Sequence, residues 1–346
     1  MEEQLDRSLT EGRVGCFCTQ NSWNCETGRY TADIFRQRGN LAALFTPREG
    51  ELNPGTSHIE FSQEELEGLS AVVVEIQDAG ARYFNYTRDV MRLLSFCARM
   101  EEAPSIYIVD HFNPAGRIVE GCIPVGECES WVPHVANRHG LTLGELCNLY
   151  CNEIGAKFPL HVISAHAGGS NRRRLPWTIA PASDIPGMFT CLMYCGGGLW
   201  NNTNVNPGIG TARPYEYIGA PFIRRSAIDN VPAPEGVAMR PCTFTPSAGL
   251  YAGEKCHGYQ IVLTSSEPYH SLLHTLQLMG YFRDRYSEFE MSDALHAKIA
   301  NPVISEYLRG GITFDIVREH VKLEEQKWIR KAKRFVLYED EPYRIK

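Results

Sequence analysis

The sequence predicts an α/β fold, with a doubly wound, mostly parallel sheet followed by a second, smaller α/β domain. Two observations carry this prediction. The first half of the chain holds strand-like segments that are apolar throughout, and segments with helical periodicity separate them. Strands that are apolar on both faces are typical of a parallel sheet covered by helices on each side.

The strands and helices of the first half alternate in a regular order. The predicted strands are 13–20, 40–47, 71–78, 105–112 and 160–165, and the predicted helices lie near 29–38, 63–68, 86–100 and 142–154. The last helix is the best marked, because Thr142 and Glu145 have the spacing of a capping box. The apolar residues that follow, from Leu143 to Ile154, form one stripe at helical spacing.

The second half has a different character. Loops rich in Pro and Gly run from residue 166 to about residue 255, and one strand and three amphipathic helices follow them. The strand is predicted at 259–265, and the helices are predicted near 268–282, 292–299 and 315–334. A length of 346 residues fits two domains. We therefore expect a first domain at 1–165 and a loop-rich second domain at 166–346 that closes a cleft.

Polar residues follow the predicted strands of the first domain. They are Glu75, Gln77 and Asp78 at the third strand, and Asp110, His111 and Asn113 at the fourth. In open α/β sheets, ligands bind outside the carboxyl ends of the strands. The sequence therefore predicts a ligand site at this edge of the sheet.

Composition and charge exclude several classes of partner. A hydrophobic content of 43% and a charged content of 22% are ordinary for a globular protein. The net charge is -7 and the basic patches at 171–177 and 327–334 are short, so nucleic acid is not an expected partner. No run approaches the roughly 18 apolar residues of a membrane span. The acidic, polar start lacks the features of a secretion signal, so we expect a cytoplasmic protein that does not bind membranes.

Cofactor and metal signals are weak. No glycine fingerprint follows the first strand, so a nicotinamide or flavin enzyme is disfavoured and no cofactor is expected. The chain has twelve cysteines, which we interpret as reduced thiols packed in the core. Cys147 with Cys151, and Cys191 with Cys195, have i,i+4 spacing, whereas zinc sites usually repeat a tighter C-x-x-C. Core packing is thus preferred to a metal site.

Six motifs occur in a fixed order along most of the chain. They are EIQDAGARYFNY at 75–86, DHFNPAGRIVEG at 110–121, RHGLTLGEL at 138–146, LPW at 175–177, TNVNPGIGTARPYEYIGAPFI at 203–223 and YAGEKCHGYQI at 251–261. In order and spacing they resemble the exo-β-N-acetylmuramidases, which remove terminal N-acetylmuramic acid from peptidoglycan fragments. This resemblance implies a Rossmann-like N-terminal domain, a C-terminal α/β domain, and a glycosidase that acts on a small amino-sugar glycoside in cell-wall recycling. An oligomer is compatible with it.

Several polar positions depart from the family pattern. Arg48 and Glu49 stand where the family shows Glu-His, Asn201 and Pro207 where it is acidic, and Ile209 where it has Arg. These changes leave open whether hydrolysis is retained. The alternatives are a homologue that binds a sugar or small anion without cleaving it, and an enzyme of altered chemistry on the same fold.

Carboxylates in the matched motifs are the candidates for catalysis. Glycoside hydrolysis usually needs a carboxylic acid and a second carboxylate, whose pKa values are pushed apart by their proximity. We predict Glu75 and Glu120 as this pair, assisted by His139, which precedes a helix amino terminus. The alternative for His139 is a structural role in its loop. Asp78 either contacts substrate or caps the following helix or pairs with Arg82.

Further residues are predicted to bind substrate. A guanidinium suits bidentate capture of a carboxylate such as the lactyl group of muramic acid, although each arginine here has the alternative of pairing with a neighbouring acid. Tyr83, Tyr86 and Trp177 either face a sugar ring or belong to the core. The predicted substrate-binding residues are Gln77, Asp78, Arg82, Tyr86, Asp110, Asn113, Arg138, Asn204 and Arg213.

Overall fold

The computed structural model describes residues 7–47, 58–126, 132, 134–165, 179–224, 230–265 and 269–338. The chain divides into two compact units. Unit 1 contains 1–116, 140–186 and 332–342, and unit 2 contains 117–139, 187–331 and 343–346. The sequence analysis expected one boundary after residue 165. The units instead exchange segments, because 117–139 packs with unit 2 and 332–342 packs with unit 1.

Unit 1 is built on a five-stranded parallel sheet with the order β4-β1-β5-β6-β7. The strands are β1 (Val14–Cys18), β4 (Leu41–Phe45), β5 (Ala71–Glu75), β6 (Ser105–Asp110) and β7 (Leu160–Ser164). Each lies within a predicted strand, so the predicted doubly wound α/β sheet is confirmed. The continuous burial of β1 and β5 explains why their sequences are apolar throughout.

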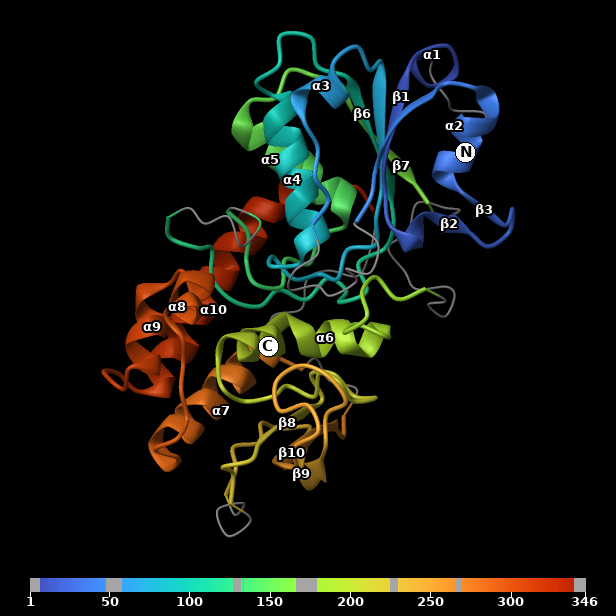
Figure 1. The fold of residues 1–346 in the computed structure, drawn as a ribbon. Coiled ribbons are helices and arrows are strands. Elements are labelled where there is room, and N and C mark those ends of the chain that lie inside the picture. Colours follow the sequence, from blue (N-terminus) through green and yellow to red (C-terminus); the bar gives the residue numbers. More distant parts are fainter. Residues whose placement is uncertain are drawn as a thin grey trace. The chain divides into compact units, whose positions relative to one another are not determined.

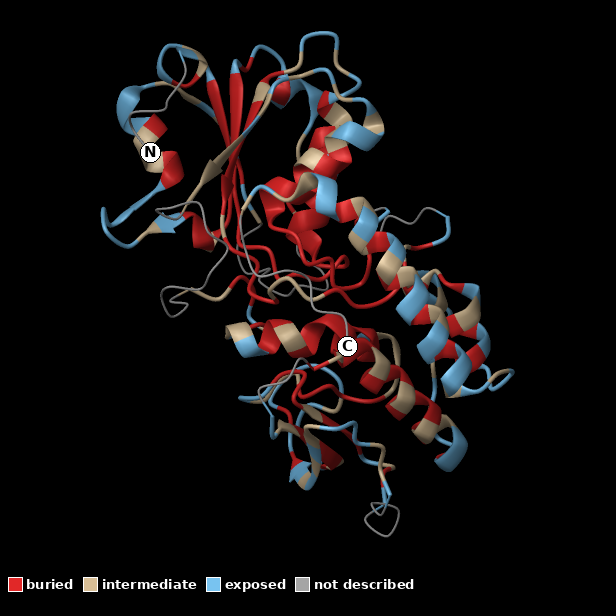
Figure 2. Cartoon of the chain, turned by 180° about the vertical axis from the view of Figure 1, so that it is seen from behind, coloured by how far each residue is buried: buried red, intermediate tan, exposed pale blue. Residues whose placement is uncertain are grey.

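Helices cover both faces of this sheet (Figure 1). They are α1 (Arg7–Thr10), α2 (Thr31–Arg38), α3 (Gln63–Leu66), α4 (Asn85–Cys97) and α5 (Leu143–Ile154). On one face, Leu9 and Phe35 pack with Cys16, Val73 and Val109 in a single core cluster. On the other face lie α4 and α5, with α5 against β6 and β7. Figure 2 shows the central strands buried and the helices exposed on their outer surfaces.

A short hairpin that the sequence analysis did not predict follows β1. It consists of η2 (Gln20–Ser22), β2 (Trp23–Asn24) and β3 (Arg29–Tyr30), and the two strands pair antiparallel. Strands of two residues carry no periodicity, which explains why the pattern of the sequence did not reveal them. The hairpin leads directly into α2.

Unit 2 combines helices with a three-stranded antiparallel sheet of order β8-β10-β9. Its elements are α6 (Met188–Gly197), η3 (Gly198–Asn202), β8 (Tyr217–Ala220), β9 (Val237–Phe244), β10 (Cys256–Leu263), α7 (Ser271–Arg285), α8 (Asp293–Ile299), α9 (Pro302–Leu308) and α10 (Phe314–Ala332), while η5 (Lys333–Phe335) belongs to unit 1. The predicted strand and three helices of this half are present. In the part of the chain described, no helix has the length and apolar character needed to cross a membrane.

Helix α6 falls within the stretch from residue 166 to about residue 255, which was expected to be loop because it is rich in Pro and Gly. The glycine at 196 has a packing role. A Cβ on Gly196 would lie 2.2 Å from the carbonyl carbon of Ser271, so only glycine allows α6 to approach the start of α7 this closely.

Candidate active site

Glu75 lies at the carboxyl end of β5, next to β1. Between these two strands the order in which the chain adds strands to the sheet reverses direction. The neighbours β1 and β5 are paired in register, with Cys18 opposite Glu75. From β1 the chain crosses to β4 on one side, whereas β6 and β7 extend the sheet on the other side of β5. Ligands in doubly wound sheets bind at such switch points. The structure thus places Glu75 at the position where this fold most often builds a site.

The Glu75 carboxylate is held by two side chains. The hydroxyl of Thr31, at the start of α2, donates to Oε2, and His111 Nε2 lies 3.1 Å from Oε1. The Glu75 side chain is 9% exposed and that of His111 is 19% exposed. A carboxylate paired with a part-exposed imidazole is suited to proton transfer. The sequence analysis placed His111 at the end of the next predicted strand, on the same edge of the sheet, whereas it did not single out Thr31.

A cavity of about 330 Å³ within unit 1 lies beside Glu75. Its lining residues are Leu9, Asn24, Thr27, Arg29, Thr31, Ile34, Phe35, Val73, Glu75, Tyr107, Val109 and Ile163. The strand residues among them belong to the sheet face that α1 and α2 cover, so this wall is mainly apolar. Arg29 and Asn24, on the hairpin, supply polar groups together with Glu75. Apolar walls with a few polar groups are usual in small-molecule sites.

Three predicted substrate-binding residues at the same edge hold loops together. Gln77 Nε2 donates to the carbonyl of Phe112 at 3.1 Å. Asp78 accepts from the backbone N–H of Gly80 at 2.8 Å and from the Thr87 hydroxyl at 2.5 Å. Asn113 Oδ1 accepts from the Ala115 N–H of its own loop, and Nδ2 donates to the carbonyl of Leu141 in another loop, each at 2.9 Å. These contacts favour the structural alternative for Asp78 and a positional role for Asn113.

Asp110, also predicted to bind substrate, anchors the start of α5. It accepts from the Thr142 hydroxyl at 2.7 Å, the Gly144 N–H at 2.8 Å and the Tyr338 hydroxyl at 2.7 Å. Burial raises the pKa of Asp110 to about 6, and these three hydrogen bonds oppose the rise by stabilising the charged form. A Cβ on Gly144 would lie 2.8 Å from the Asp110 carboxylate, so glycine is what permits this approach.

Arg82, Tyr83 and Tyr86 are buried in unit 1. The ring of Tyr86 packs edge-on against Phe84, with the ring centroids 5.4 Å apart. This burial favours the core alternative for both tyrosines. Arg48, Glu49 and Trp177 lie outside the described residues.

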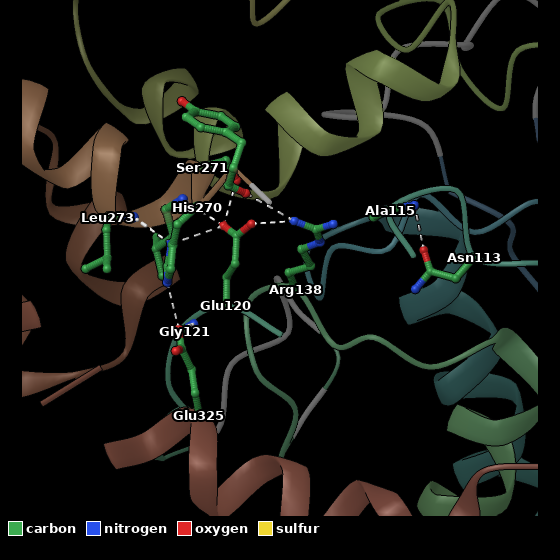
Figure 3. Close-up of polar contacts among 11 residues, drawn as sticks. Asn113, Ala115, Glu120, Gly121, Arg138, His270, Ser271, Leu273 and Glu325 are labelled. Atoms are coloured by element: carbon green, nitrogen blue, oxygen red, sulfur yellow. Dashed lines mark hydrogen bonds and ion pairs between the residues drawn. The ribbon is translucent and has the colours of Figure 1, made fainter. Parts of the chain in front are cut away.

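Glu120, in unit 2, is the centre of a buried polar cluster (Figure 3). Its carboxylate has 0% exposure and lies 2.6 Å from Arg138 Nη1. The other oxygen accepts from the Ser271 hydroxyl at 2.7 Å and from the Leu272 N–H at 2.8 Å. Burial alone would raise the pKa of Glu120, but the charges of His270 and Arg138 and these hydrogen bonds together lower it. Glu120 is therefore held as an anion.

His270 and Glu325 extend this cluster, and the sequence analysis missed both. His270 Nε2 lies 2.8 Å from Glu325 Oε1, and Nδ1 lies 3.2 Å from the backbone nitrogen of Leu273 at the start of α7. Glu325 also accepts from the Gly121 N–H at 2.8 Å. Burial acts to lower the pKa of His270, and the charges of Glu120 and Glu325 outweigh it, so the pKa is raised. Neither residue lies in a matched motif, and no local pattern marks them.

His139 is fully buried in unit 2. Its carbonyl accepts from the indole N–H of Trp328 at 2.9 Å, which fixes the loop that follows Arg138. This contact favours the structural alternative that the sequence analysis left open.

Asn204 and Arg213, predicted to bind substrate, also have local partners. Asn204 Nδ2 donates to the carbonyl of Glu288 at 2.7 Å and Oδ1 accepts from the Glu290 N–H at 2.9 Å, so this side chain holds a loop. Arg213 is 56% exposed and pairs with Glu216 at 3.2 Å. Of the altered positions, Asn201 donates to the Tyr215 hydroxyl, and Pro207 accepts from the Tyr215 N–H.

Among the described residues, no group of three or more His, Cys, Asp or Glu side chains is arranged to hold a metal ion. Cys147 in α5 and both Cys191 and Cys195 in α6 are buried free thiols, and Cys151 is half-buried.

Family models cover both halves of the chain. The model described as exo-β-N-acetylmuramidase NamZ, N-terminal, matches residues 55–183, and the model described as exo-β-N-acetylmuramidase NamZ, C-terminal, matches residues 192–338. The chain belongs to this family. The resemblance found in the six motifs is thereby confirmed.

Individual relatives agree with this assignment. The chain is 27% identical over 288 residues to the peptidoglycan β-N-acetylmuramidase NamZ of Bacillus subtilis, covering 80% of this chain and 69% of that protein. Two crystal structures of DUF1343 family proteins from Bacteroides fragilis have the same fold. One has a TM-score of 0.77 at 20% identity and covers 98% of both chains. The other has a TM-score of 0.80 at 19% identity and covers 98% of this chain and 97% of its own.

Proposed function

We propose that this protein is an exo-acting glycosidase that releases terminal N-acetylmuramic acid from peptidoglycan fragments. Membership of the exo-β-N-acetylmuramidase family supports the reaction class, since both family models match. At the level of residues, the proposal is supported by the Glu75 carboxylate, which lies at the switch point of the sheet and lines a cavity of about 330 Å³. The partner is accordingly a small amino-sugar glycoside.

Glu75 is proposed as the catalytic carboxylate and His111 as its proton-transfer partner. In hydrolysis a carboxylic acid gives its proton to the glycosidic oxygen as the bond to the anomeric carbon breaks, and water supplies the new hydroxyl. The 3.1 Å contact between His111 Nε2 and Glu75 Oε1 gives a route by which that proton is restored. Thr31 fixes the orientation of the carboxylate through its hydrogen bond to Oε2.

Glu120 is assigned a positioning role in place of the catalytic role expected from the sequence. A general acid must be protonated, whereas Arg138 and His270 hold Glu120 as an anion with a lowered pKa. A nucleophile or base must reach the sugar or a water, whereas the Glu120 side chain is 0% exposed. Each of its oxygens already has partners inside unit 2. Its effect is to fix Arg138 and the start of α7.

The substitution Glu75→Gln tests the assignment. It removes the proton-transfer group while keeping size and shape, so we expect kcat for release of N-acetylmuramic acid from a chromogenic β-N-acetylmuramide to fall roughly 100- to 10 000-fold. Glu67→Gln, at the exposed end of α3, is the matched control and should retain full activity. Wild-type turnover by a folded Glu75→Gln protein would remove Glu75 from the mechanism.

We further propose that this reaction takes place in the cytoplasm and belongs to cell-wall recycling. The cysteines that the structure describes are free thiols, which fits a reducing compartment. Cell fractionation with detection of the protein checks this, and recovery outside the cytoplasm would contradict it.

A further inference from the structure

The cavity beside Glu75 has a cationic end that the sequence analysis did not single out. Arg29, in β3, lines this cavity together with Glu75. Its side chain donates from Nη1 to Gln37 Oε1 at 2.8 Å, and Gln37 is neutral. Asp33, on the same helix as Gln37, is ion-paired with Arg36. Among the described residues, Arg29 therefore has no carboxylate partner.

The other arginines considered for ligand binding differ from Arg29 in this respect. Arg82 is fully buried, Arg138 is ion-paired with Glu120, and Arg213 is ion-paired with Glu216. A guanidinium whose charge is already neutralised adds little attraction for a further anion. Arg29 alone of these four combines an unneutralised charge with a place on the cavity wall.

We propose that Arg29 binds a carboxylate substituent of the sugar in this cavity and so determines specificity for acidic amino sugars. The proposal deepens the proposed function and rests on it, because it names the part of the substrate that the cavity selects. A planar guanidinium pairs with a carboxylate through two parallel hydrogen bonds, which gives direction as well as attraction. The lactyl group of N-acetylmuramic acid is such a carboxylate, and N-acetylglucosamine has none.

The remaining walls of the cavity fit the rest of such a ligand. Phe35, Val109 and Ile163 offer apolar surface to methyl groups and to the C–H face of a pyranose ring. The volume of about 330 Å³ lies near the lower limit of roughly 300 Å³ for small-molecule sites, so one sugar residue fills it. With the carboxylate at Arg29, the polar side of the ring is left for Glu75 and Thr31.

The test compares two substrates that differ only in the lactyl ether, a chromogenic β-N-acetylmuramide and the corresponding β-N-acetylglucosaminide. For Arg29→Met, kcat/KM on the muramide should fall roughly 10- to 100-fold, mainly through KM, because a charge-assisted bidentate contact is lost. Activity on the glucosaminide should not fall. Arg29→Lys keeps the charge and should restore part of the loss. Arg38→Met, an exposed arginine at the end of α2, is the matched control and should change neither activity.

Binding measurements separate this inference from the proposed function. Calorimetry with free N-acetylmuramic acid and free N-acetylglucosamine requires no turnover. Arg29→Met should lower the affinity for N-acetylmuramic acid roughly 10- to 100-fold and leave the affinity for N-acetylglucosamine unchanged. If the wild type hydrolyses neither substrate but binds N-acetylmuramic acid in an Arg29-dependent manner, the function fails and the inference stands. If Arg29→Met retains wild-type KM and affinity for the acidic sugar, the inference is overturned whatever the activity.

Discussion

At the scale of single residues, environment separates two glutamates that the sequence treats alike. Glu75 and Glu120 both lie in matched motifs. The first keeps part of its carboxylate at a cavity, beside an imidazole and a hydroxyl. The second is sealed inside a cluster with an arginine, a serine and a backbone amide. The same side chain is thus suited to proton transfer in one place and to fixing neighbours in the other.

The pairing of Glu120 with Arg138 predicts a large stability effect. Arg138→Met leaves the buried Glu120 carboxylate without its ion-paired guanidinium, so we expect the free energy of unfolding to fall by about 3–5 kcal/mol. Urea denaturation of the purified protein measures this. Arg213→Met removes the exposed pair with Glu216 and should cost less than about 1 kcal/mol. Similar losses for the two variants would contradict a structural role for the Glu120 cluster.

At the scale of elements, helix α5 shows how a local signal gains a long-range partner. The capping box predicted from Thr142 and Glu145 is present, and the Thr142 side chain accepts from the Glu145 N–H. The structure adds Asp110, from the end of β6, which accepts from the Thr142 hydroxyl and from the Gly144 N–H. The start of the helix is therefore tied to the sheet.

Removal of this cap should destabilise the protein more than removal of an exposed one. We expect Thr142→Ala to lower the free energy of unfolding by about 1–2 kcal/mol, because the helix loses its cap and Asp110 loses a donor. Ser62→Ala removes the capping-box serine from the exposed start of α3. It should lower the free energy of unfolding by only about 0.5 kcal/mol. Chemical denaturation of both variants gives the comparison. Equal losses would mean that Asp110 adds nothing to the cap.

At the scale of the whole molecule, the two units share their chain in several places. The segment 332–342 belongs to unit 1, where the Tyr338 hydroxyl donates to Asp110 and the Leu337 N–H donates to Glu145 at 2.9 Å. The segment 117–139 carries Glu120 and Arg138 into unit 2. Dividing the chain at one position therefore separates each unit from one of its own segments.

A fragment ending at residue 165 should accordingly be less stable than the full chain. It lacks the donors from 337 and 338, and it exposes Glu120 without Ser271. We expect its thermal midpoint to lie at least about 5 °C lower, since losing two part-buried hydrogen bonds to carboxylates costs a few kcal/mol. Adding a peptide of residues 332–342 should recover part of the difference. Circular dichroism measures the thermal midpoint of the fragment with and without the peptide. A fragment that melts at the same temperature as the full chain would refute the prediction.

Local sequence patterns were sufficient to predict the main sheet, the start of one helix and the family of this protein. The five parallel strands, the capped start of α5 and the family motifs were all readable, because apolar runs, capping spacing and short motifs depend on neighbouring residues. The same patterns predicted that Glu75 lies at the sheet edge where ligands bind in this type of fold, since parallel strands all finish at one edge.

Tertiary structure alone decided which polar residues meet. Thr31 contacts Glu75 over a separation of 44 residues in the sequence, and Ser271 contacts Glu120 over a separation of 151. A local sequence pattern cannot predict contacts between residues so far apart. The hairpin that brings Arg29 to the cavity is too short to leave a periodic signal. Burial, charge pairing and access to a cavity arise only when distant segments pack, so the different surroundings of Glu75 and Glu120 followed from the fold.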